Sequence, residues 1–194
     1  LKKRVIIALL KAGNWLCKND EKHGFLSNHL SAAAAALTII NIHCNDSKFE
    51  ARSNYFLKKI YSRQSSEGWY EEYGGADVGY QTHGSFYLAR IWQHTKDPFL
   101  LSSLKKSLEF LSFFIHPDGT FGGEYCSRNT TFFFPAVFEM LSSESLEAGS
   151  ICKFMREIIN DHKNASLNTV DAYNFLPLIN NYIFAHISYK KIKN

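Results

Sequence analysis

Apolar residues recur three and four positions apart over most of this chain, which is the spacing of amphipathic helices. Residues 3–18 show it first, with Val5, Ile6, Leu9 and Leu10 on one stripe. The pattern predicts a series of helices at residues 3–18, 28–43, 47–63, 79–94, 97–115, 129–142, 145–160 and 171–187. We therefore expect an all-α protein.

Two kinds of helix alternate in this series. The helices at 47–63 and 97–115 have one apolar face and one charged face, as expected of an outer layer. The helix at 28–43 contains the alanine run Ala32–Ala36, and the helix at 79–94 has few charges, so both are expected to be packed on several sides. Long polar loops follow the outer helices and short loops follow the inner ones. The order predicts an array of helix pairs, each outer and then inner.

The starts of two helices carry specific signals. Ser27 or Asn28 is a suitable N-cap for the helix at 28–43, because both side chains accept hydrogen bonds from first-turn N–H groups. Pro135 lies inside the pattern of the helix at 129–142, and a proline in that place either begins a helix or kinks it.

Three glycine-containing loops repeat one pattern ahead of the inner helices. Glu67–Arg90 combines acids, tyrosines and glycines in a turn that runs into a helix; Asp118–Glu139 repeats this, and His23–Leu37 does so faintly. The loop glycines recur roughly every 45 to 50 residues, a period typical of helical arrays. Loops so rich in Gly, Asp, Glu and Tyr favour a toroid, in which they converge on one mouth, over an open solenoid. We expect these loops at one end of the molecule: 21–28, 65–79 and 116–129.

The composition fits one folded domain spanning residues 1–194. The chain is 45% hydrophobic and 15% aromatic, which is enough to fill a core. It has no run of apolar residues long enough for a membrane span. The net charge of +4 is spread over helix faces without a basic stripe interleaved with aromatic residues, so nucleic acid is not an expected partner.

The four cysteines form no metal-binding or redox motif, because Cys17, Cys44, Cys126 and Cys152 are far apart in sequence. This spacing indicates reduced thiols in a reducing compartment, so we expect a cytoplasmic location and neither metal nor other cofactor. The chain begins with Leu1 rather than Met, which fits a piece of a longer protein whose targeting segment, if any, lies outside this sequence.

Two loops carry the segments by which the chain can be compared with known families. They are Gly68-Trp69-Tyr70-Glu71-Glu72-Tyr73, Gly75-Ala76-Asp77 and Gly79-Tyr80-Gln81-Thr82 in one loop, and Asp118-Gly119, Gly123-Glu124-Tyr125 and Ser127-Arg128-Asn129-Thr130 in the next. With these segments the chain resembles the α/α-toroid proteins of the terpenoid cyclase-like superfamily. Within them it is most similar to the toroidal domain of heparinase II/III-like and related polysaccharide lyases, over roughly residues 5–187.

The resemblance implies an incomplete α/α toroid of about four antiparallel helical hairpins, as one domain or as a fragment of a longer toroid. It also implies a β-sandwich domain C-terminal to this chain, and an oligosaccharide or polysaccharide as substrate. Three family features are missing: the Asp-rich motif and Gln-Trp repeats of triterpene cyclases, and the Cys-His-Gly zinc ligands of lanthionine cyclases.

For a polysaccharide lyase, β-elimination needs a group that neutralises the uronate carboxylate, a base and an acid. The candidates, in that order, are Asn28, Arg128 or Asn129; then His29 or His83; then Tyr73, Tyr80 or Tyr125, with the tyrosines also candidates for the base. Each residue has a structural alternative. The histidines can be hydrogen-bonded in the core, the tyrosines can pack the toroid wall, and Arg128-Asn129 can cap a helix.

Three other functions stay open. Paired carboxylates among Glu71, Glu72, Asp77 and Glu124 would suit a glycoside hydrolase, although loop acids are more often caps or ion-pair partners. A cavity lined by phenylalanines would suit isoprenoid binding; the candidates are Phe86, Phe132, Phe133 and Phe134. A domain that binds glycan without turnover, or only supports a neighbouring domain, is the non-enzymatic alternative.

The repeat also predicts a shared cleft, since equivalent positions of repeated hairpins project in the same way. Its expected lining is Glu72, Tyr73, Asp77, Tyr80, Glu124, Tyr125, Arg128 and Asn129. Trp69, Tyr70 and Phe121 are candidates for sugar-stacking platforms, although aromatic residues at such places more often anchor their loops. We expect an acidic oligosaccharide to bind in this cleft through Arg128 and the amides of Asn28 and Asn129. The carboxylates of Glu72, Asp77 and Glu124 oppose this unless they are paired or protonated.

Overall fold

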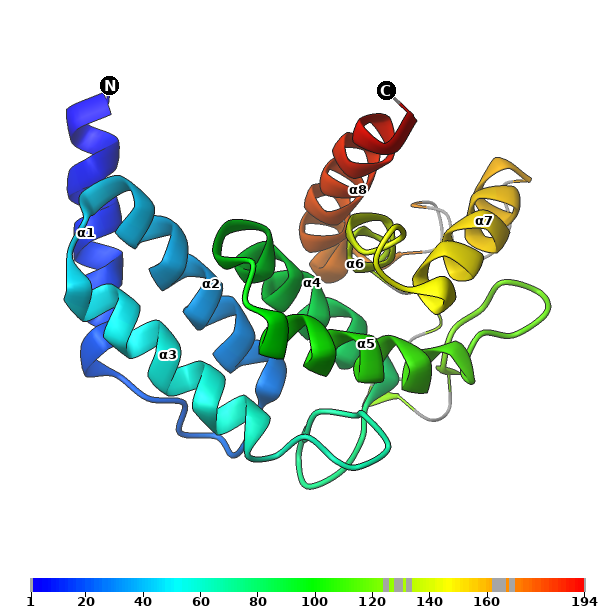
Figure 1. Ribbon diagram of the computed structural model, residues 1–194, viewed down its shortest axis with the longest axis horizontal. Helices are drawn as coiled ribbons and strands as arrows, with labels where there is room; N and C mark the ends of the chain where they lie inside the picture. The colour runs from blue at the N-terminus through cyan, green and yellow to red at the C-terminus, as the bar shows by residue number, and fades with distance from the viewer. Residues whose placement is uncertain are drawn as a thin grey trace.

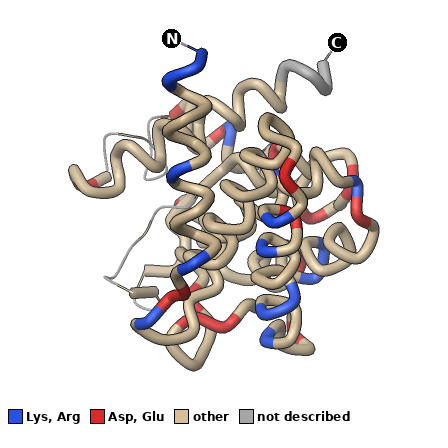
Figure 2. The backbone as a smooth tube through the Cα atoms, turned by 90° about the vertical axis from the view of Figure 1, so that its left-hand side faces the viewer, with Lys and Arg blue, Asp and Glu red and all other residues tan. Residues whose placement is uncertain are grey.

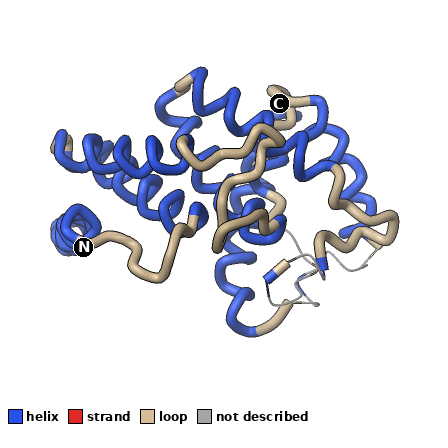
Figure 3. The backbone as a smooth tube through the Cα atoms, turned by 90° about the horizontal axis from the view of Figure 1, so that it is seen from below, coloured by secondary structure: helices blue, strands red, loops and turns tan. Residues whose placement is uncertain are grey.

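The computed structural model describes residues 2–123, 126–127, 131, 134–161, 167 and 170–193, with side chains up to Tyr189. The helices are α1 (Lys2–Lys18), α2 (Ser27–Cys44), α3 (Ser47–Tyr61), α4 (Val78–Thr95), α5 (Pro98–Ser112), α6 (Ala136–Met140), α7 (Leu146–Asn160) and α8 (Ala172–Lys193). Within these residues there are isolated β-bridges but no strand (Figure 3). The predicted all-α class is confirmed.

The helices form two layers that follow an arc from α1 to α8 (Figure 1). In the inner layer α2 contacts α4, α4 contacts α6, and α6 contacts α8. In the outer layer α1 contacts α3 and α5 contacts α7, while α2–α3, α4–α5 and α6–α7 pack as adjacent hairpins. The alternation of outer and inner helices was therefore predictable from the distribution of charged residues. Basic and acidic positions are interspersed along the side that faces the viewer in Figure 2.

Most predicted helix boundaries lie within three residues of the observed ones. One exception is the helix expected at 129–142, because α6 begins only at Ala136 and Pro135 is its N-cap. The other is the helix expected at 171–187, because α8 continues to Lys193. Of the two alternatives for Pro135, the structure shows a helix start. A proline suits that position since the N–H groups of a first turn have no partner within the helix.

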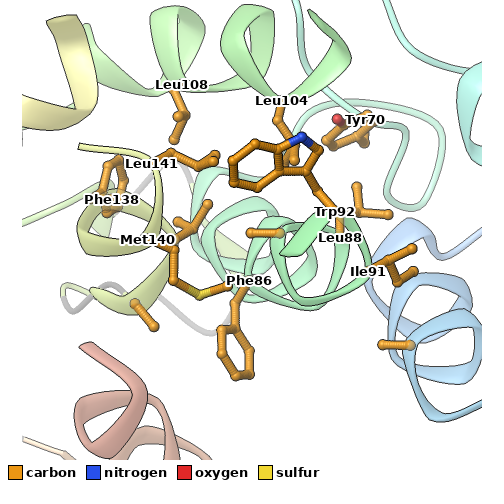
Figure 4. Close-up of a cluster of buried hydrophobic side chains, with 14 of the residues drawn as sticks. Tyr70, Phe86, Leu88, Ile91, Trp92, Leu104, Leu108, Phe138, Met140 and Leu141 are labelled. Carbon is orange, nitrogen blue, oxygen red and sulfur yellow. The ribbon is translucent and has the colours of Figure 1, made fainter. Parts of the chain in front are cut away.

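The core lies between the two layers and is built from Leu, Ile, Phe and Ala side chains. Figure 4 shows its centre, where Trp92 and Leu88 of α4 meet Leu104 and Leu108 of α5 and Leu141 after α6. Because leucine and aromatic side chains of three helices meet there, the apolar faces predicted from periodicity account for the core.

Polar side chains also form hydrogen bonds between the loop that joins α3 to α4 and helix α5. The Tyr70 hydroxyl lies 2.8 Å from Ser103 Oγ, and Ser103 in turn donates to Gln64 Oε1 at 2.7 Å. Gly68 is required in this loop, since a Cβ there would lie 2.2 Å from the carbonyl oxygen of Lys106. The loop is thus held against α5 by buried hydrogen bonds and by a backbone approach that only glycine allows.

The helix starts differ in how they are capped. Asp46, Asp77, Asp97 and Ser145 each accept a hydrogen bond from a first-turn N–H group of their own helix. For α2, however, the N-cap is Leu26, whose side chain makes no such bond, so the expectation that Ser27 or Asn28 caps this helix is wrong. The acceptor comes instead from a distant loop, as the next subsection describes.

No helix in the described part of the chain is both long and apolar enough to cross a membrane. Among the four cysteines, Cys126 and Cys152 are buried and Cys17 and Cys44 are partly buried.

Candidate functional site

The loops that precede α2 and α4 lie side by side. The Ser27 N–H donates to the Glu71 carbonyl oxygen, and the Tyr73 N–H donates to the Phe25 carbonyl oxygen, both at 3.2 Å. Within the next loop, the Ser127 N–H donates to Asp77 Oδ2 at 2.6 Å. The described parts of the three repeated loops therefore meet at one end of the molecule, as expected from their repetition.

Glu72 supplies the missing cap of α2. Its side chain is buried and accepts from the Asn28 N–H at 2.6 Å and from Asn28 Nδ2 at 2.9 Å. Burial raises the pKa of this carboxyl to about 7, although the two bonds from Asn28 act in the opposite direction. Both carboxyl oxygens of Glu72 thus accept hydrogen bonds from Asn28, so Glu72 joins the second loop to α2.

Asp77 has the corresponding role at α4. Its buried carboxylate accepts from the Tyr80 N–H at 2.9 Å through Oδ1, while Oδ2 receives the Ser127 N–H. Glu72 and Asp77, both expected to contact substrate, are therefore bonded to main-chain or amide N–H groups. In this geometry they hold the loops together.

His83 of α4 is held in an aromatic environment. Its ring stacks on Phe134 with 4.2 Å between ring centroids, and Nε2 lies 3.2 Å from the Tyr87 hydroxyl. Burial lowers the pKa of His83 to about 4, with a smaller contribution from the nearby His29. His83 is therefore neutral near pH 7.

His29, one turn into α2, forms a carboxylate–imidazole pair with Glu21. His29 Nδ1 lies 2.5 Å from Glu21 Oε2, and His23 Nδ1 lies 2.8 Å from Oε1 of the same carboxylate. The Lys22 and His23 N–H groups also donate to Oε1. These bonds, chiefly the one from His29, lower the pKa of Glu21 to about 2, so the carboxylate stays ionised.

This pair borders a pocket of about 440 Å³ between the end of α1 and the start of α2. Trp15 contributes an indole ring that is 63% exposed. The pocket is lined by Trp15, Leu16, Asn19, Asp20, Glu21, Lys22, His23, His29, Leu30, Ala33 and Phe56. An aromatic face, a cation and an oriented imidazole thus surround one space.

Arg52 of α3 binds three residues that line this pocket. It donates to the carbonyl oxygens of Leu16 and Asn19 at 3.2 and 3.1 Å, and its Nη2 lies 2.7 Å from Asp20 Oδ1. The charge of Asp20 is therefore balanced by a guanidinium, and the loop after α1 is tied to α3.

The other expected site residues are placed as follows. Tyr73 is exposed, and its ring centroid lies 6.4 Å from that of Tyr80, so these two residues are neighbours. Trp69 Nε1 donates to Glu67 Oε2 at 3.0 Å. None of these three residues borders the pocket at His29. Glu124, Tyr125, Arg128 and Asn129 lie outside the described residues, as do Phe132 and Phe133.

Neither Glu21 nor Trp15 is among the site residues expected from the sequence. The sequence offers one signal for them. Glu21 lies two residues before His23 and eight before His29, in a loop that follows a helix with Trp15 near its end. Over the described residues, no group of three or more His, Cys, Asp or Glu side chains is arranged to hold a metal ion.

Comparison of the chain with protein-family models, with curated proteins and with solved structures gives no match. A function for the chain must therefore be argued from its own geometry.

Proposed function

We propose that this chain is a carbohydrate-active domain of the α/α-toroid type, in which the pocket between α1 and α2 binds an acidic oligosaccharide and His29 takes up a proton. The observation that carries the proposal is the Glu21–His29 pair at a pocket with an exposed indole face. The alternating helix layers and the adjacent loops support the toroid part of the proposal.

Glu21 is the positioning residue in this scheme. Its carboxylate accepts the Nδ1–H of His29, which leaves the lone pair on Nε2 and stabilises the imidazolium formed after proton uptake. This is the geometry of a general base with an orienting acid. His29 Nε2 would remove the proton next to the uronate carboxylate, the electron pair would form the new carbon–carbon double bond, and the glycosidic oxygen would leave with a proton.

The charge-neutralising group and the acid of β-elimination also have candidates at the same pocket, which offers a platform for a sugar ring as well. Lys22 offers a positive charge for the uronate carboxylate, and Trp15 offers a flat face for a sugar ring. His23, bound to the same carboxylate as His29, is a candidate donor for the leaving oxygen. The sequence predicts Asn28, Arg128 or Asn129 for charge neutralisation. Asn28 donates to Glu72, while Arg128 and Asn129 stay part of the proposal as additional contacts.

The alternatives receive less support from the described residues. A glycoside hydrolase needs two carboxyl groups free to face the sugar, whereas Glu72 and Asp77 are buried and occupied by N–H donors. An isoprenoid cavity needs open phenylalanine faces, whereas Phe86 and Phe134 are buried in packed clusters.

The test is a product assay on a panel of polyuronides and neutral glycans, measured by the absorbance of the unsaturated product. His29→Ala should reduce turnover by about a hundredfold or more, as for loss of a general base. His43→Ala is the matched control, because His43 is an exposed histidine in the last turn of the same helix. Hydrolysis of a neutral glycan would replace the lyase by a hydrolase, and no binding to any glycan would reject a carbohydrate function.

A further inference from the structure

Helix α8 carries a buried stripe and an exposed stripe on opposite sides. One consists of Leu178, Asn181, Ala185 and Ser188, which are buried against the rest of the molecule. Asn181 Oδ1 accepts from the Ala136 N–H at 2.7 Å, and Phe184 packs beside Phe86 and Arg90. This side is the contact of α8 with the inner layer.

The second stripe is exposed and has the spacing of a coiled coil. Its residues, three and four positions apart in alternation, are Tyr173, Leu176, Asn180, Ile183 and Ile187. The apolar members are 89%, 74%, 53% and 44% exposed in chain order. Alternation of three and four is the a/d repeat by which two helices pack against each other. The stripe therefore has the form of an interface for one further helix.

Comparison with α2 and α4 indicates that this stripe is normally covered. Those two inner helices are also apolar around most of their circumference, and each is contacted on both sides by neighbouring helices. An all-round apolar helix is expected to be buried on all sides. Helix α8 is also rich in apolar residues, but it is covered on the side that faces α6, Phe86 and Arg90 of α4 and Arg156 of α7, while its second stripe stays exposed. An array whose end carries such a face, rather than a polar one, lacks its outermost contact.

We infer that the exposed stripe of α8 is a dimer interface, with the α8 of a second copy of this chain as its occupant. Asn180 is the reason for choosing a second copy, because it lies at the centre of the stripe at an a-type position. Two parallel copies place Asn180 opposite Asn180, where the two amides can donate to and accept from each other; a single buried Asn of this kind specifies a two-stranded register. No Asp, Glu, Lys or Arg occurs between Ala172 and Tyr189, so no like charges oppose the pairing.

Pro177 is compatible with this interface. It lies beside the stripe rather than on it, and it removes one backbone hydrogen bond, to the carbonyl oxygen of Tyr173. The positions from Leu176 to Ile187 follow in helical conformation, so most of the stripe keeps its spacing.

The experiment is sedimentation equilibrium of the full chain over a wide concentration range. The wild type should show a monomer–dimer equilibrium. Ile183→Glu should weaken dimerisation by about a hundredfold or more, because it buries two charges in an apolar contact. Leu146→Glu is the matched control, since Leu146 is 82% exposed on α7 and outside the stripe, and it should leave the equilibrium unchanged.

Asn180→Leu tests the same interface with an expected effect opposite to that of Ile183→Glu. It replaces the polar a-type layer by an apolar one, so association should become tighter. Helical content measured by circular dichroism should be unchanged in all three variants, because each altered side chain is exposed. A wild type that stays monomeric at high concentration, equal effects of Ile183→Glu and Leu146→Glu, or weaker association of Asn180→Leu would each overturn the inference.

Discussion

The acidic residues of two neighbouring loops have opposite roles in this molecule. Glu21, in the loop before α2, binds the rings of His29 and His23 at the edge of an open pocket. Glu72, in the loop before α4, is buried and binds the Asn28 N–H and amide. The two acids differ in burial and in their donors. Glu21 is partly buried and accepts from two histidine rings as well as from two main-chain N–H groups, whereas Glu72 is buried and accepts from the Asn28 N–H and amide. A loop acid is best assigned from its donors rather than from its position in a repeat.

Among substitutions that test this difference, Glu72→Ala is expected to have the largest effect on the free energy of unfolding. It leaves the Asn28 N–H and amide without their acceptor, so the free energy of unfolding should fall by about 3 kcal/mol. Urea denaturation at pH 6 measures this. Glu71→Ala is the control, because Glu71 pairs with the largely exposed Arg63 and should cost less than about 1 kcal/mol. Equal losses would mean that the buried cap contributes no more than a surface pair.

The two acids should also give opposite pH dependence of stability. The pKa of Glu72 is raised to about 7, so the folded state binds its proton more tightly, and stability should fall by about 2 kcal/mol as the pH rises from about 4.5 to 7. The pKa of Glu21 is lowered to about 2, so its contribution is present above about pH 4.5 and is lost as the pH falls towards 2.

Chemical denaturation across this pH range separates the two contributions. Glu72→Gln should remove the fall in stability between pH 4.5 and 7 and leave the loss of stability below pH 4.5. Glu21→Gln should remove the loss below pH 4.5 and leave the fall between pH 4.5 and 7. If both variants change the same part of the profile, the assignment of the two carboxyl groups is wrong.

A smaller effect is expected from Asp77→Ala, which removes the cap of α4 and the bond from Ser127. The expected loss of stability is about 2 kcal/mol. Asp97→Ala is a matched control, because Asp97 caps α5 through the Phe99 N–H and should cost about 1 kcal/mol. The difference measures the bond that links two repeats, and no difference in the melting curves would show that this bond adds nothing.

The smallest effect on stability is expected at Trp15. Because its ring is exposed, Trp15→Ala should change the free energy of unfolding by less than about 0.5 kcal/mol. Glycan affinity, measured by calorimetry, should fall roughly tenfold if the indole stacks on a sugar. Phe113→Ala, at an exposed ring remote from the pocket lining, should alter neither quantity. A loss of stability without a loss of affinity would remove Trp15 from the proposed site.

The all-α class and most helix positions were predictable because helix periodicity is a local property of the sequence. The positions of α2 and α4 in the inner layer followed from Ala32–Ala36 and from the few charges of 79–94. The cap of α2 was not predictable, because its acceptor Glu72 lies 44 residues away and is brought there only by the packing of α2 on α4. Local rules favoured Ser27 or Asn28 instead.

The candidate site was predicted only in part. The sequence predicts His29 or His83 as a candidate base from their places at the heads of inner helices, and of these two His29 borders a pocket while the ring of His83 is stacked on Phe134. The partner of His29, Glu21, was missed because the distance between them depends on how the loop after α1 folds back, which Arg52 controls from α3. The sequence predicts Glu72 and Asp77 as substrate contacts, and it does not reveal that both carboxyl groups accept from main-chain or amide N–H groups in the fold.

The long-range cap of α2 also bears on how the chain is made. The first turn of α2 leaves the ribosome 44 residues before Glu72, its acceptor. At about 5–20 residues per second this interval lasts a few seconds. During that time the Asn28 N–H has only water as a partner, and the start of α2 is expected to fray. Nascent chains that end before residue 72 should therefore protect α2 poorly from hydrogen exchange, and protection should appear once the second loop has closed over it.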